Sequence, residues 1–384
     1  MSIASKICLL AFAALSLSCA SAATRPNDYS ISTWWKPSST THYPDVHVDH
    51  SITFHLKAPQ ASHVELLFGE WDIKPQPMTR DQAGDWTVTI GPVEPEIYSY
   101  LFSVDGTRTL DLGNPRVKAG TEVYGNIVEV PGTPPRFDEI QNVPHGMIEI
   151  RPYLSTALHR LRHVYIFLPP DYGRDPTKLY PVLYLRHGGG DSEASWSQDG
   201  RAGVILENLL STKEAVPMII VMTNGMTDGS WAGGSSPEGI ALLERELMED
   251  VIPLVEKNYR VSTNREDRAI TGLSMGGGQA FVMGLHHLDR FAWVGEFSAG
   301  LLSAADFNVD RLLPGVLKDA SVNQKLRLLW LGCGKADPRY NGYANLVDLL
   351  QGRGIAVKLH DSKGGHEWKV WRHQLHDFLQ VVFR

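Results

Sequence analysis

The chain contains 384 residues, of which 21% are charged and 43% are hydrophobic, and its formal net charge at pH 7 is −7. A chain of this length is expected to form two domains. The mildly acidic balance and the lack of basic runs argue against a nucleic-acid partner, and no stretch after the N-terminus is long and apolar enough for a membrane-spanning helix.

The first 22 residues have the features of a cleavable secretory signal peptide. Lys6 provides a short positive region, residues 7–17 form an apolar run too short to span a bilayer, and Ala20-Ser21-Ala22 is a small-residue cleavage site. We therefore expect a bacterial protein that is secreted or periplasmic. Residues 23–45 would form a lead segment before the first domain.

Cysteine usage agrees with an exported protein that relies on its core. The sequence has three cysteines, Cys8, Cys19 and Cys333. Cys19 raises the alternative of a lipoprotein, but the residue three positions earlier is Ser16 rather than leucine or valine. Removal of the signal peptide leaves Cys333 alone, so no intramolecular disulfide is expected. Cys333 lies in a predicted buried strand, where it would act as a small hydrophobic residue.

Residues 46–131 have the pattern of a small all-β domain. Short segments of alternating apolar and polar residues are separated by turn signals such as Gly84-Asp85 and Asp105-Gly106. Several short strands at this spacing predict a β-sandwich. The proline-rich residues 132–147 follow as a semi-rigid linker. The predicted strands are Ser51–Leu56, Val64–Phe68, Trp86–Ile90 and Tyr98–Val104.

Residues 148–384 alternate between short apolar strands and amphipathic helices. This order favours a largely parallel sheet covered on both faces, so the predicted fold class of this part is α/β. The clearest helix spans residues 238–258, and Pro253 within it predicts a kink or a break. The expected buried strands are Val164–Leu168, Pro181–Leu185, Met218–Met222, Arg268–Thr271, Leu326–Leu331 and Ala356–Leu359.

The segment Gly272-Leu273-Ser274-Met275-Gly276 fits the G-x-S-x-G pattern between a predicted strand and a predicted helix. Small residues permit the sharp, strained turn that lifts a serine hydroxyl clear of a sheet. The turn also places that hydroxyl near a helix N-terminus, where backbone N–H groups favour developing negative charge. Ser274 is therefore the predicted nucleophile.

A serine nucleophile needs a general base, and the base needs an orienting acid. In α/β-hydrolases the chain order is serine, acid and histidine. His366 follows the strand at 356–359 and the Gly364-Gly365 turn and precedes a helix, and active groups of open α/β sheets lie on such loops. His366 is thus the predicted base. His373 and His376 lie within the helix, where we expect surface or packing roles.

The acid should come from a similar loop between the serine and the histidine. Asp337 ends the turn at 332–337, directly after the predicted strand at 328–331. An aspartate at this place can also act as a turn or helix cap. Asp306 and Asp310, in a less regular region, are the alternatives for the acid.

A tetrahedral oxyanion needs two backbone N–H donors. Met275 follows the nucleophile and would supply one of them. The loop His187-Gly188-Gly189-Gly190 follows the strand at 181–185 and is similar to the HGGG-type motif of esterases, so it would supply the other. His187 itself is expected to be structural. No phosphate-binding G-x-x-x-x-G-K-[ST] pattern follows this loop.

With these residues placed, the C-terminal part resembles the esterase D family, and within it the enzymes of carbohydrate esterase family 1, which include feruloyl esterases and some acetyl xylan esterases. The resemblance implies an α/β-hydrolase fold with Ser274 as nucleophile, Asp337 as acid and His366 as base. It also implies Met275 and Gly189 as oxyanion donors and a two-step acyl transfer without a metal or an organic cofactor. The likeness is carried by Tyr259-Arg260, Arg268–Gly277, Gly332–Asp337 and Gly365–Arg372.

Residues 46–131 resemble the immunoglobulin-like early-set module that often precedes such esterases and is related to glycogen-binding modules. Trp71 and Trp86 could form a platform for sugar stacking. Tryptophan in a small sandwich is more often a core residue, and we expect that role for both. The segments that carry this likeness are Phe54–Pro59, Met78–Asp81, Gly84–Thr87 and Tyr98–Gly106.

Export and an accessory sandwich favour a polysaccharide or small-molecule ester as substrate, with feruloyl or acetyl groups on xylan-type polysaccharide as the first expectation. Trp231, in the loop 224–231, would line an aromatic acyl pocket, stack on a sugar or simply pack. One alternative is a siderophore esterase of the enterochelin type, whose triply anionic substrate suits an acidic chain less well. Two others are an acyltransferase similar to mycolyl transferases and, from another class, a non-catalytic glycan-binding protein.

Overall fold

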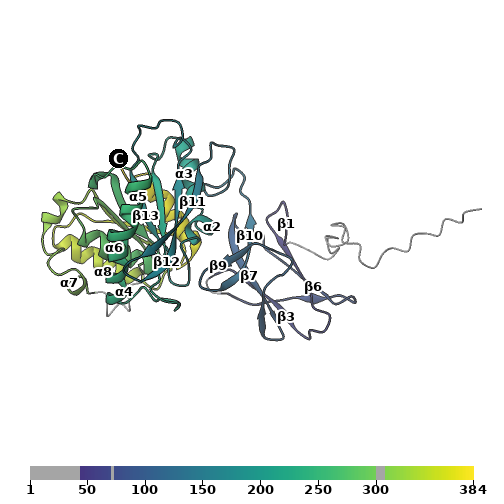
Figure 1. Cartoon of the computed structure of the whole chain (residues 1–384). Helices are drawn as coiled ribbons and strands as arrows, with labels where there is room; N and C mark the ends of the chain where they lie inside the picture. Colours follow the sequence, from purple (N-terminus) through teal and green to yellow (C-terminus); the bar gives the residue numbers. More distant parts are fainter. Residues whose placement is uncertain (1–43, 71–72, 300–307) are drawn as a thin grey trace, which may run out of the picture. The chain divides into compact units, whose positions relative to one another are not determined.

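The computed structural model of the chain describes residues 44–70, 73–299 and 308–384, which belong to one compact unit (Figure 1). The predicted signal peptide, the lead segment up to residue 43, Trp71 and Asp306 lie outside the described residues. Among the helices of the described part, none is both long and apolar enough to cross a membrane.

Two antiparallel sheets occupy the N-terminal end of the described chain, and their buried side chains share one core. Ile52 and Phe54 are buried on one face of their strand because successive strand residues point to opposite faces. Phe54 packs edge-to-face on Tyr100 with 4.8 Å between ring centroids. Trp86 is buried in the same core and donates its indole N–H to the Ala58 carbonyl at 2.9 Å, in agreement with the expected packing role.

The strands of these two sheets are short and follow a fixed order. One sheet has the order β1 (Asp45–Val46), β2 (Ile52–Lys57), β6 (Asp85–Ile90), β5 (Thr79–Arg80). The other has the order β4 (Gln76–Pro77), β3 (Val64–Phe68), β7 (Glu96–Val104), β10 (Val123–Val130), β9 (Val117–Ala119), with β8 (Thr107–Thr109) paired to β7.

A single eight-stranded sheet forms the framework of the C-terminal part. Its first pairs are antiparallel and all pairs from β14 onward are parallel. Each of the six strands expected from the sequence overlaps one of its strands, and the expected bounds differ from the observed ones by up to four residues at an end. The order is β11 (Met147–Ser155), β12 (Arg160–Leu168), β14 (Ile219–Thr223), β13 (Val182–Arg186), β15 (Arg268–Gly272), β16 (Trp293–Phe297), β17 (Leu328–Gly334), β18 (Lys358–Ser362).

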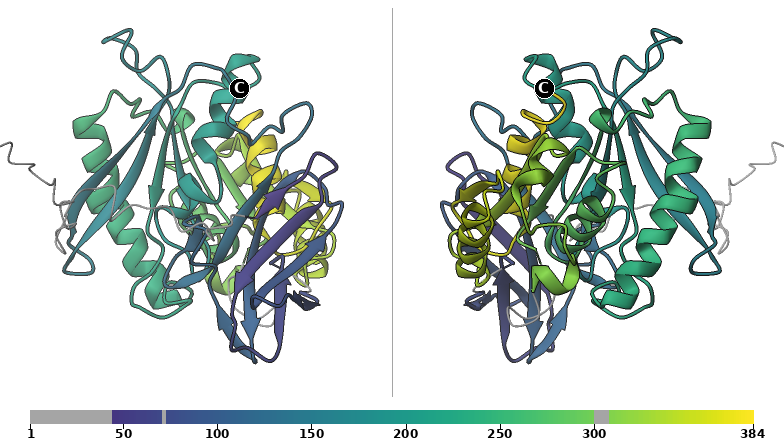
Figure 2. Two further views of the ribbon diagram at one scale, coloured as in Figure 1. Left: turned by 90° about the vertical axis from the view of Figure 1, so that its right-hand side faces the viewer. Right: turned by 90° about the vertical axis from the view of Figure 1, so that its left-hand side faces the viewer.

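Helices cover both faces of this sheet, as Figure 2 shows. In β13, Val182 and Tyr184 point into one core, whereas Leu183 and Leu185 point into the other. The first core is closed by α4 (Pro237–Glu246), α6 (Ser274–His286) and α8 (Tyr340–Gly352), and the second by α3 (Ala202–Ser211) and α9 (Trp368–Leu379). The shorter helical segments are α2 (Ser195–Gln198), η2 (Arg265–Asp267), α7 (Val309–Leu312) and η3 (Ala320–Gln324).

The helix predicted over residues 238–258 is interrupted in the way that Pro253 indicates. A five-residue π-helical segment, η1 (Leu247–Val251), separates α4 from α5 (Ile252–Asn258). Proline has no N–H to donate to the preceding turn, and the wider π turn accommodates its ring. The amphipathic face still continues through the break, because Leu243 and Val255 lie in the same core.

Strand β16 was not among the strands expected from the sequence. A glutamate, Glu296, is the fourth of its five residues and breaks the apolar run. The structure buries this side chain, with 1% exposed, beside Tyr343. Burial raises the pKa of Glu296 well above its usual value, which favours the neutral form of the carboxyl, and a neutral carboxyl costs less to bury than a charged one.

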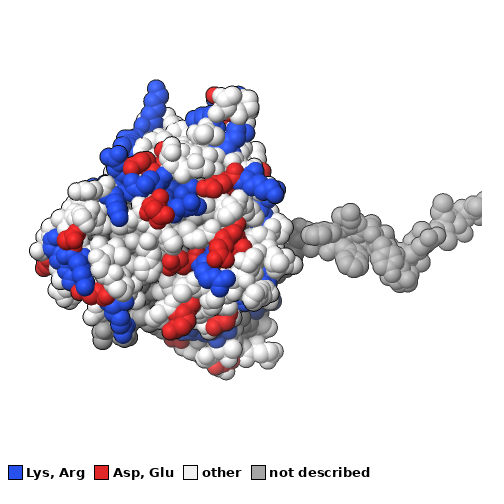
Figure 3. Space-filling view, turned by 60° about the vertical axis from the view of Figure 1, so that its left-hand side comes forward, with Lys and Arg blue, Asp and Glu red and all other residues white. Residues whose placement is uncertain are grey.

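Buried ion pairs connect the N-terminal sheets to the α/β part of this unit. The guanidinium of Arg372, which is 1% exposed, lies 2.5 Å from Glu96 and 2.9 Å from Asp138. Glu70 accepts the backbone N–H of Trp368 at 3.0 Å. Separating these groups would leave buried charges unpaired, which fixes the two regions against each other. On the outer face drawn in Figure 3, by contrast, basic and acidic side chains are interspersed.

Candidate active site

Ser274 stands on a strained turn between strand β15 and helix α6. Its φ of +48° is unusual for a residue other than glycine. Two glycines make this turn possible by allowing close backbone approach. A Cβ atom at Gly272 would lie 2.6 Å from the Gly276 carbonyl oxygen, and one at Gly276 would overlap the His187 carbonyl oxygen. Both glycines of the motif are therefore required by the packing of the strand, the helix and the neighbouring loop.

The structure brings Ser274, His366 and Asp337 into one hydrogen-bonded chain. Nε2 of His366 lies 3.0 Å from Oγ of Ser274, and Nδ1 lies 2.7 Å from Oδ2 of Asp337. A carboxylate can only accept, so Nδ1 carries the proton and Nε2 is the acceptor for the serine hydroxyl. This is the tautomer that a general base requires.

Asp337 is held as a carboxylate. Its side chain is fully buried, and burial on its own would raise the pKa of the carboxyl. The hydrogen bond and the electrostatic interaction with His366, together with the backbone N–H of Arg339, outweigh burial and keep the pKa of Asp337 below its usual value. The group is therefore negative at neutral pH and can stabilise a protonated His366.

Close contact between the loops after β17 and β18 brings the acid and the base together. The N–H of Lys335 donates to the Ser362 carbonyl at 2.8 Å, and that of Ala336 donates to the Gly364 carbonyl at 2.9 Å. A side chain at Gly334 would overlap the Gly364 carbonyl oxygen. Gly364 itself has a φ of +114°, which favours glycine.

His187 orients the loop that was expected to bind the oxyanion. Its ring is 1% exposed, and burial lowers the pKa of this histidine to about 3, so the ring is neutral. Nε2 accepts the N–H of Gly225 at 2.8 Å, and Nδ1 donates to the Gly188 carbonyl at 2.8 Å. The Gly188 carbonyl and the Gly189 N–H belong to the same trans peptide, so they point in opposite directions. By holding this carbonyl, His187 also sets the direction of the Gly189 N–H. His187 thus has the structural place expected for it.

The backbone of Met275 and the loop 187–190 both lie next to Ser274. Met275 is the second residue of α6, where N–H groups have no carbonyl acceptor within the helix. A Cβ atom at Gly188 would lie 3.2 Å from Cβ of Ser274, so the loop runs directly beside the serine.

Trp231 lies over this same loop at the protein surface. Its side chain is 58% exposed, and a Cβ atom at Gly189 would lie 3.0 Å from its ring. Its backbone carbonyl accepts the N–H of Gly190 at 2.7 Å. Trp231 therefore presents a free aromatic face next to the expected oxyanion donor.

The other candidates named from the sequence lie elsewhere. Asp310 pairs with Arg353 at 2.7 Å and does not meet His366. The rings of His373 and His376 each lie 4.6 Å from the ring of Phe137. Their packing role is as expected.

Cys333 is fully buried within β17, as expected for a small hydrophobic residue. Burial raises the pKa of its thiol to about 12, so the group stays protonated.

Arg339 is a neighbour of the base that sequence reasoning missed. Its Nη1 lies 3.1 Å from Nδ1 of His366 and 3.8 Å from Oδ1 of Asp337. The only signal in the sequence was its position two residues after the acid. Because 40% of its side chain is exposed, a positive charge lies at the surface beside the base.

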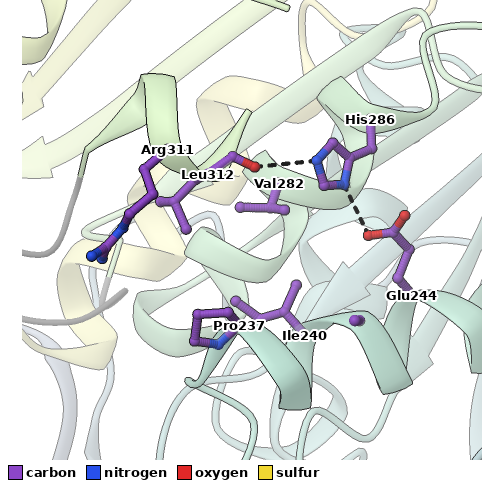
Figure 4. Close-up of a pocket in the computed structure, with 8 residues that line it drawn as sticks. Pro237, Ile240, Glu244, Val282, His286, Arg311 and Leu312 are labelled. Carbon is purple, nitrogen blue, oxygen red and sulfur yellow. Dashed lines mark hydrogen bonds and ion pairs between the residues drawn. The ribbon is translucent and has the colours of Figure 1, made fainter. Parts of the chain in front are cut away.

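A separate pocket of about 550 Å³ lies between α4, α6 and α7 (Figure 4). His286 lines it and forms hydrogen bonds to Glu244 at 3.0 Å and to the Leu312 carbonyl at 3.2 Å. His286 lies twelve residues after Ser274 on α6, roughly 18 Å along the helix axis. This pocket is therefore distinct from the Ser–His–Asp site. Within residues 44–70, 73–299 and 308–384, no group of three or more metal-ligating side chains is gathered.

A doubly covered sheet, a serine on a strained strand-to-helix turn and the Ser–His–Asp chain together define an α/β-hydrolase. Residues 155–381 match the family described as "Putative esterase". The match spans more than half of the chain, which therefore belongs to this esterase family.

Individual relatives are similar in sequence or in fold. The chain is 28% identical over 349 residues to the endo-1,4-beta-xylanase/feruloyl esterase of Xylanibacter ruminicola. The aligned region covers 89% of this chain but only 46% of that protein. A solved ferulic acid esterase superposes with a TM-score of 0.53 at 25% identity, covering 63% of this chain and 99% of the other. The enterobactin esterase of Shigella flexneri has the same fold, with a TM-score of 0.64 at 18% identity over 87% of this chain and 93% of the other.

Proposed function

We propose that this protein is a secreted serine esterase that hydrolyses carboxylic esters through Ser274, His366 and Asp337. The observation that carries the proposal is the continuous hydrogen-bonded chain from Oγ of Ser274 through His366 to Oδ2 of Asp337. In the first step His366 takes the serine proton as Oγ attacks the ester carbonyl. The protonated ring is stabilised by the Asp337 carboxylate and then protonates the leaving alcohol.

The second step releases the acid from the acyl-enzyme. Water attacks the acyl carbonyl, His366 accepts a proton from that water, and the proton returns to Oγ of Ser274 as the bond to the acyl group breaks. In both steps the N–H groups of Met275 and Gly189 would donate to the oxyanion. Their place on a helix N-terminus and on a loop oriented by a buried histidine supports this assignment, because donors that are already oriented need not reorganise.

We further propose feruloyl or acetyl esters of xylan-type polysaccharide as substrates. The relative from Xylanibacter ruminicola, named an endo-1,4-beta-xylanase/feruloyl esterase, supports this class, since its likeness extends over 89% of the chain. The exposed indole of Trp231 beside Gly189 offers a surface on which an aromatic acyl group or a sugar ring could stack.

We also propose a division of the chain that follows the sequence. Residues 1–22 would be the signal peptide, 46–131 an immunoglobulin-like early-set module, 132–147 the linker and 148–384 the catalytic domain. Two antiparallel sheets with a common core support the assignment of the first module.

The test is hydrolysis of methyl ferulate, acetylated xylan and enterobactin by the purified protein. Ser274→Ala serves as the blank, and Ser321→Ala, at an exposed serine in η3, is the matched control. Ferulate or acetate release by the wild type and by Ser321→Ala, but not by Ser274→Ala, is expected. Cleavage of enterobactin alone would identify a siderophore as the substrate in place of a polysaccharide ester. If no ester is cleaved, the proposal is wrong.

A further inference from the structure

The turn between β9 and β10, residues 120–122, belongs to the N-terminal sheets and reaches the oxyanion loop of the α/β part. The backbone N–H of Thr121 donates to the Gly190 carbonyl at 2.7 Å, and its hydroxyl Oγ1 donates to the same oxygen at 3.2 Å. The hydroxyl of Tyr124 at the start of β10 lies 2.8 Å from Oγ1 of Thr121. One carbonyl of the oxyanion loop thus receives two hydrogen bonds from this turn.

The fit between the turn and the loop leaves no spare space. A Cβ atom at Gly120 would overlap the Gly190 carbonyl oxygen and lie 2.9 Å from Cα of Asp191. A Cβ atom at Gly190 would lie 2.6 Å from the hydroxyl of Tyr124 and would also overlap the indole of Trp231. Two glycines, one on each side, therefore allow the backbones to touch.

The contact completes a set of three hydrogen-bonded restraints around the Gly189 N–H. His187 holds the Gly188 carbonyl before it, the Trp231 carbonyl holds the Gly190 N–H after it, and Thr121 holds the Gly190 carbonyl. The first two restraints come from the α/β part itself. The third comes from a segment separated from the loop by 69 residues.

The turn is itself held firmly enough to act as a restraint. Lys118 in β9 pairs with Glu70 at 2.9 Å, and Glu70 accepts the backbone N–H of Trp368, two residues after His366. Lys118 and Glu70 are 17% and 20% exposed, so this pair is only partly screened by solvent. The N-terminal sheets are thereby fixed to the loops on both sides of the site.

We propose that the β9–β10 turn is a positioning element of the catalytic site, in which Gly120 and Thr121 set the oxyanion loop through the Gly190 carbonyl. The inference rests on the proposed ester hydrolysis and adds a role for the N-terminal sheets in it. Thr121 does not touch the reacting atoms. It keeps the N–H of Gly189 oriented toward the oxyanion that develops in the transition state. Displacing this donor should therefore lower the rate of the reaction and leave ground-state binding of the substrate unchanged.

The test compares two variants of the turn with two controls. Gly120→Ala forces the turn and the loop apart, and Thr121→Val removes one of the two hydrogen bonds to Gly190. Thr121→Ser keeps the hydroxyl and should restore wild-type behaviour. Thr107→Val makes the same change at an exposed threonine of β8, in the same sheet.

The readouts are kcat and KM for methyl ferulate, the inhibition constant of phenylboronic acid and the melting temperature. A boronate bound to Ser274 imitates the tetrahedral intermediate and needs the oxyanion donors, whereas KM reports chiefly ground-state binding. Removal of a whole oxyanion donor costs about 10²–10³ in kcat. A displaced donor should cost less than a missing one. We therefore expect Gly120→Ala to lower kcat about 10- to 100-fold and to raise the inhibition constant of phenylboronic acid by a similar factor.

In both turn variants KM should stay near the wild-type value. Gly120→Ala should also lower the melting temperature by a few degrees, because overpacking a tight contact costs about 1–3 kcal/mol, whereas Thr121→Val should leave it near the wild-type value and lower kcat less. Unchanged kcat and boronate inhibition in Gly120→Ala, with an active wild type, would overturn the inference alone. Loss confined to the melting temperature or to KM would also overturn it, because it would indicate a purely structural contact. An inactive wild type would overturn the proposed function and this inference with it.

Discussion

Replacement of Asp337 by asparagine tests the Ser–His–Asp chain through the tautomer of His366. Oδ1 of Asp337 accepts the backbone N–H of Arg339 at 2.9 Å, and Oδ2 accepts Nδ1–H of His366 at 2.7 Å. In Asp337→Asn the amide oxygen must face the Arg339 N–H, which places the NH₂ group against Nδ1. Nδ1 must then be an acceptor, so the ring proton moves to Nε2. In that tautomer Nε2 cannot take the proton of Ser274.

The expected loss follows from these hydrogen bonds. With the ring held in the wrong tautomer, kcat should fall about 10⁴-fold, as in other serine triads, which corresponds to about 5 kcal/mol of activation free energy. The amide could rotate and leave the Arg339 N–H unpaired, at a cost of about 1–3 kcal/mol for a buried donor. If the amide rotates in this way, the loss is limited to roughly 5- to 150-fold, so the expected fall in kcat lies between this range and about 10⁴-fold. KM should change little, since Asp337 does not contact the substrate.

The assay is steady-state hydrolysis of methyl ferulate, with Asp361→Asn as control. Asp361 lies in β18, the strand at the edge of the sheet, where it is 38% exposed and pairs with Lys335 at 3.2 Å. The control should retain wild-type kcat. A kcat for Asp337→Asn within fivefold of the wild type would refute the reasoning about the tautomer and remove Asp337 from the site.

Three further predictions test other parts of the molecule. Ser274→Ala should abolish ester turnover and leave the circular dichroism spectrum unchanged, and residual wild-type activity would exclude this serine as nucleophile. Trp231→Ala should raise KM for methyl ferulate about 2- to 10-fold through loss of aromatic stacking, and Trp231→Phe should leave KM unchanged. An equal rise in KM for an acetyl ester in Trp231→Ala would argue against a role of Trp231 in binding the acyl group. Burial raises the pKa of Asp199 from 3.8 to about 7, so between these values the folded state binds more protons than the unfolded state, and stability falls as pH rises. The free energy of unfolding of Asp199→Asn, measured in urea, should therefore rise relative to that of the wild type between pH 5 and pH 8, by at most about 4 kcal/mol. A difference that stays constant across this pH range would contradict the raised pKa of Asp199.

Local patterns indicated much of the α/β part because they report local physics. Apolar runs marked six strands of the sheet, and Pro253 marked the break in the long helix, since a missing N–H acts within one turn. Strand β16 escaped because Glu296 interrupts its apolar run, and only its burial beside Tyr343 explains how the residue is accommodated.

Chain order and loop position were enough to nominate Ser274, Asp337 and His366, because the carboxyl ends of parallel strands meet at one edge of a sheet. The sequence did not distinguish Asp337 from Asp310 by any geometric criterion. The structure separates them, since Asp337 lies 2.7 Å from His366 whereas Asp310 pairs with Arg353. Arg339 was missed because its contact with the imidazole depends on how two loops meet.

The sequence by itself determined the class of chemistry and the strands, turns and glycines that support it, since these depend on residue type and on spacing along the chain. Only the tertiary structure decided which side chains meet across long separations. The contact of Thr121 with Gly190 and the burial of Arg372 between Glu96 and Asp138 have no local signature. Such contacts arise when separate sheets and loops pack, and packing is set by the whole fold rather than by any one segment.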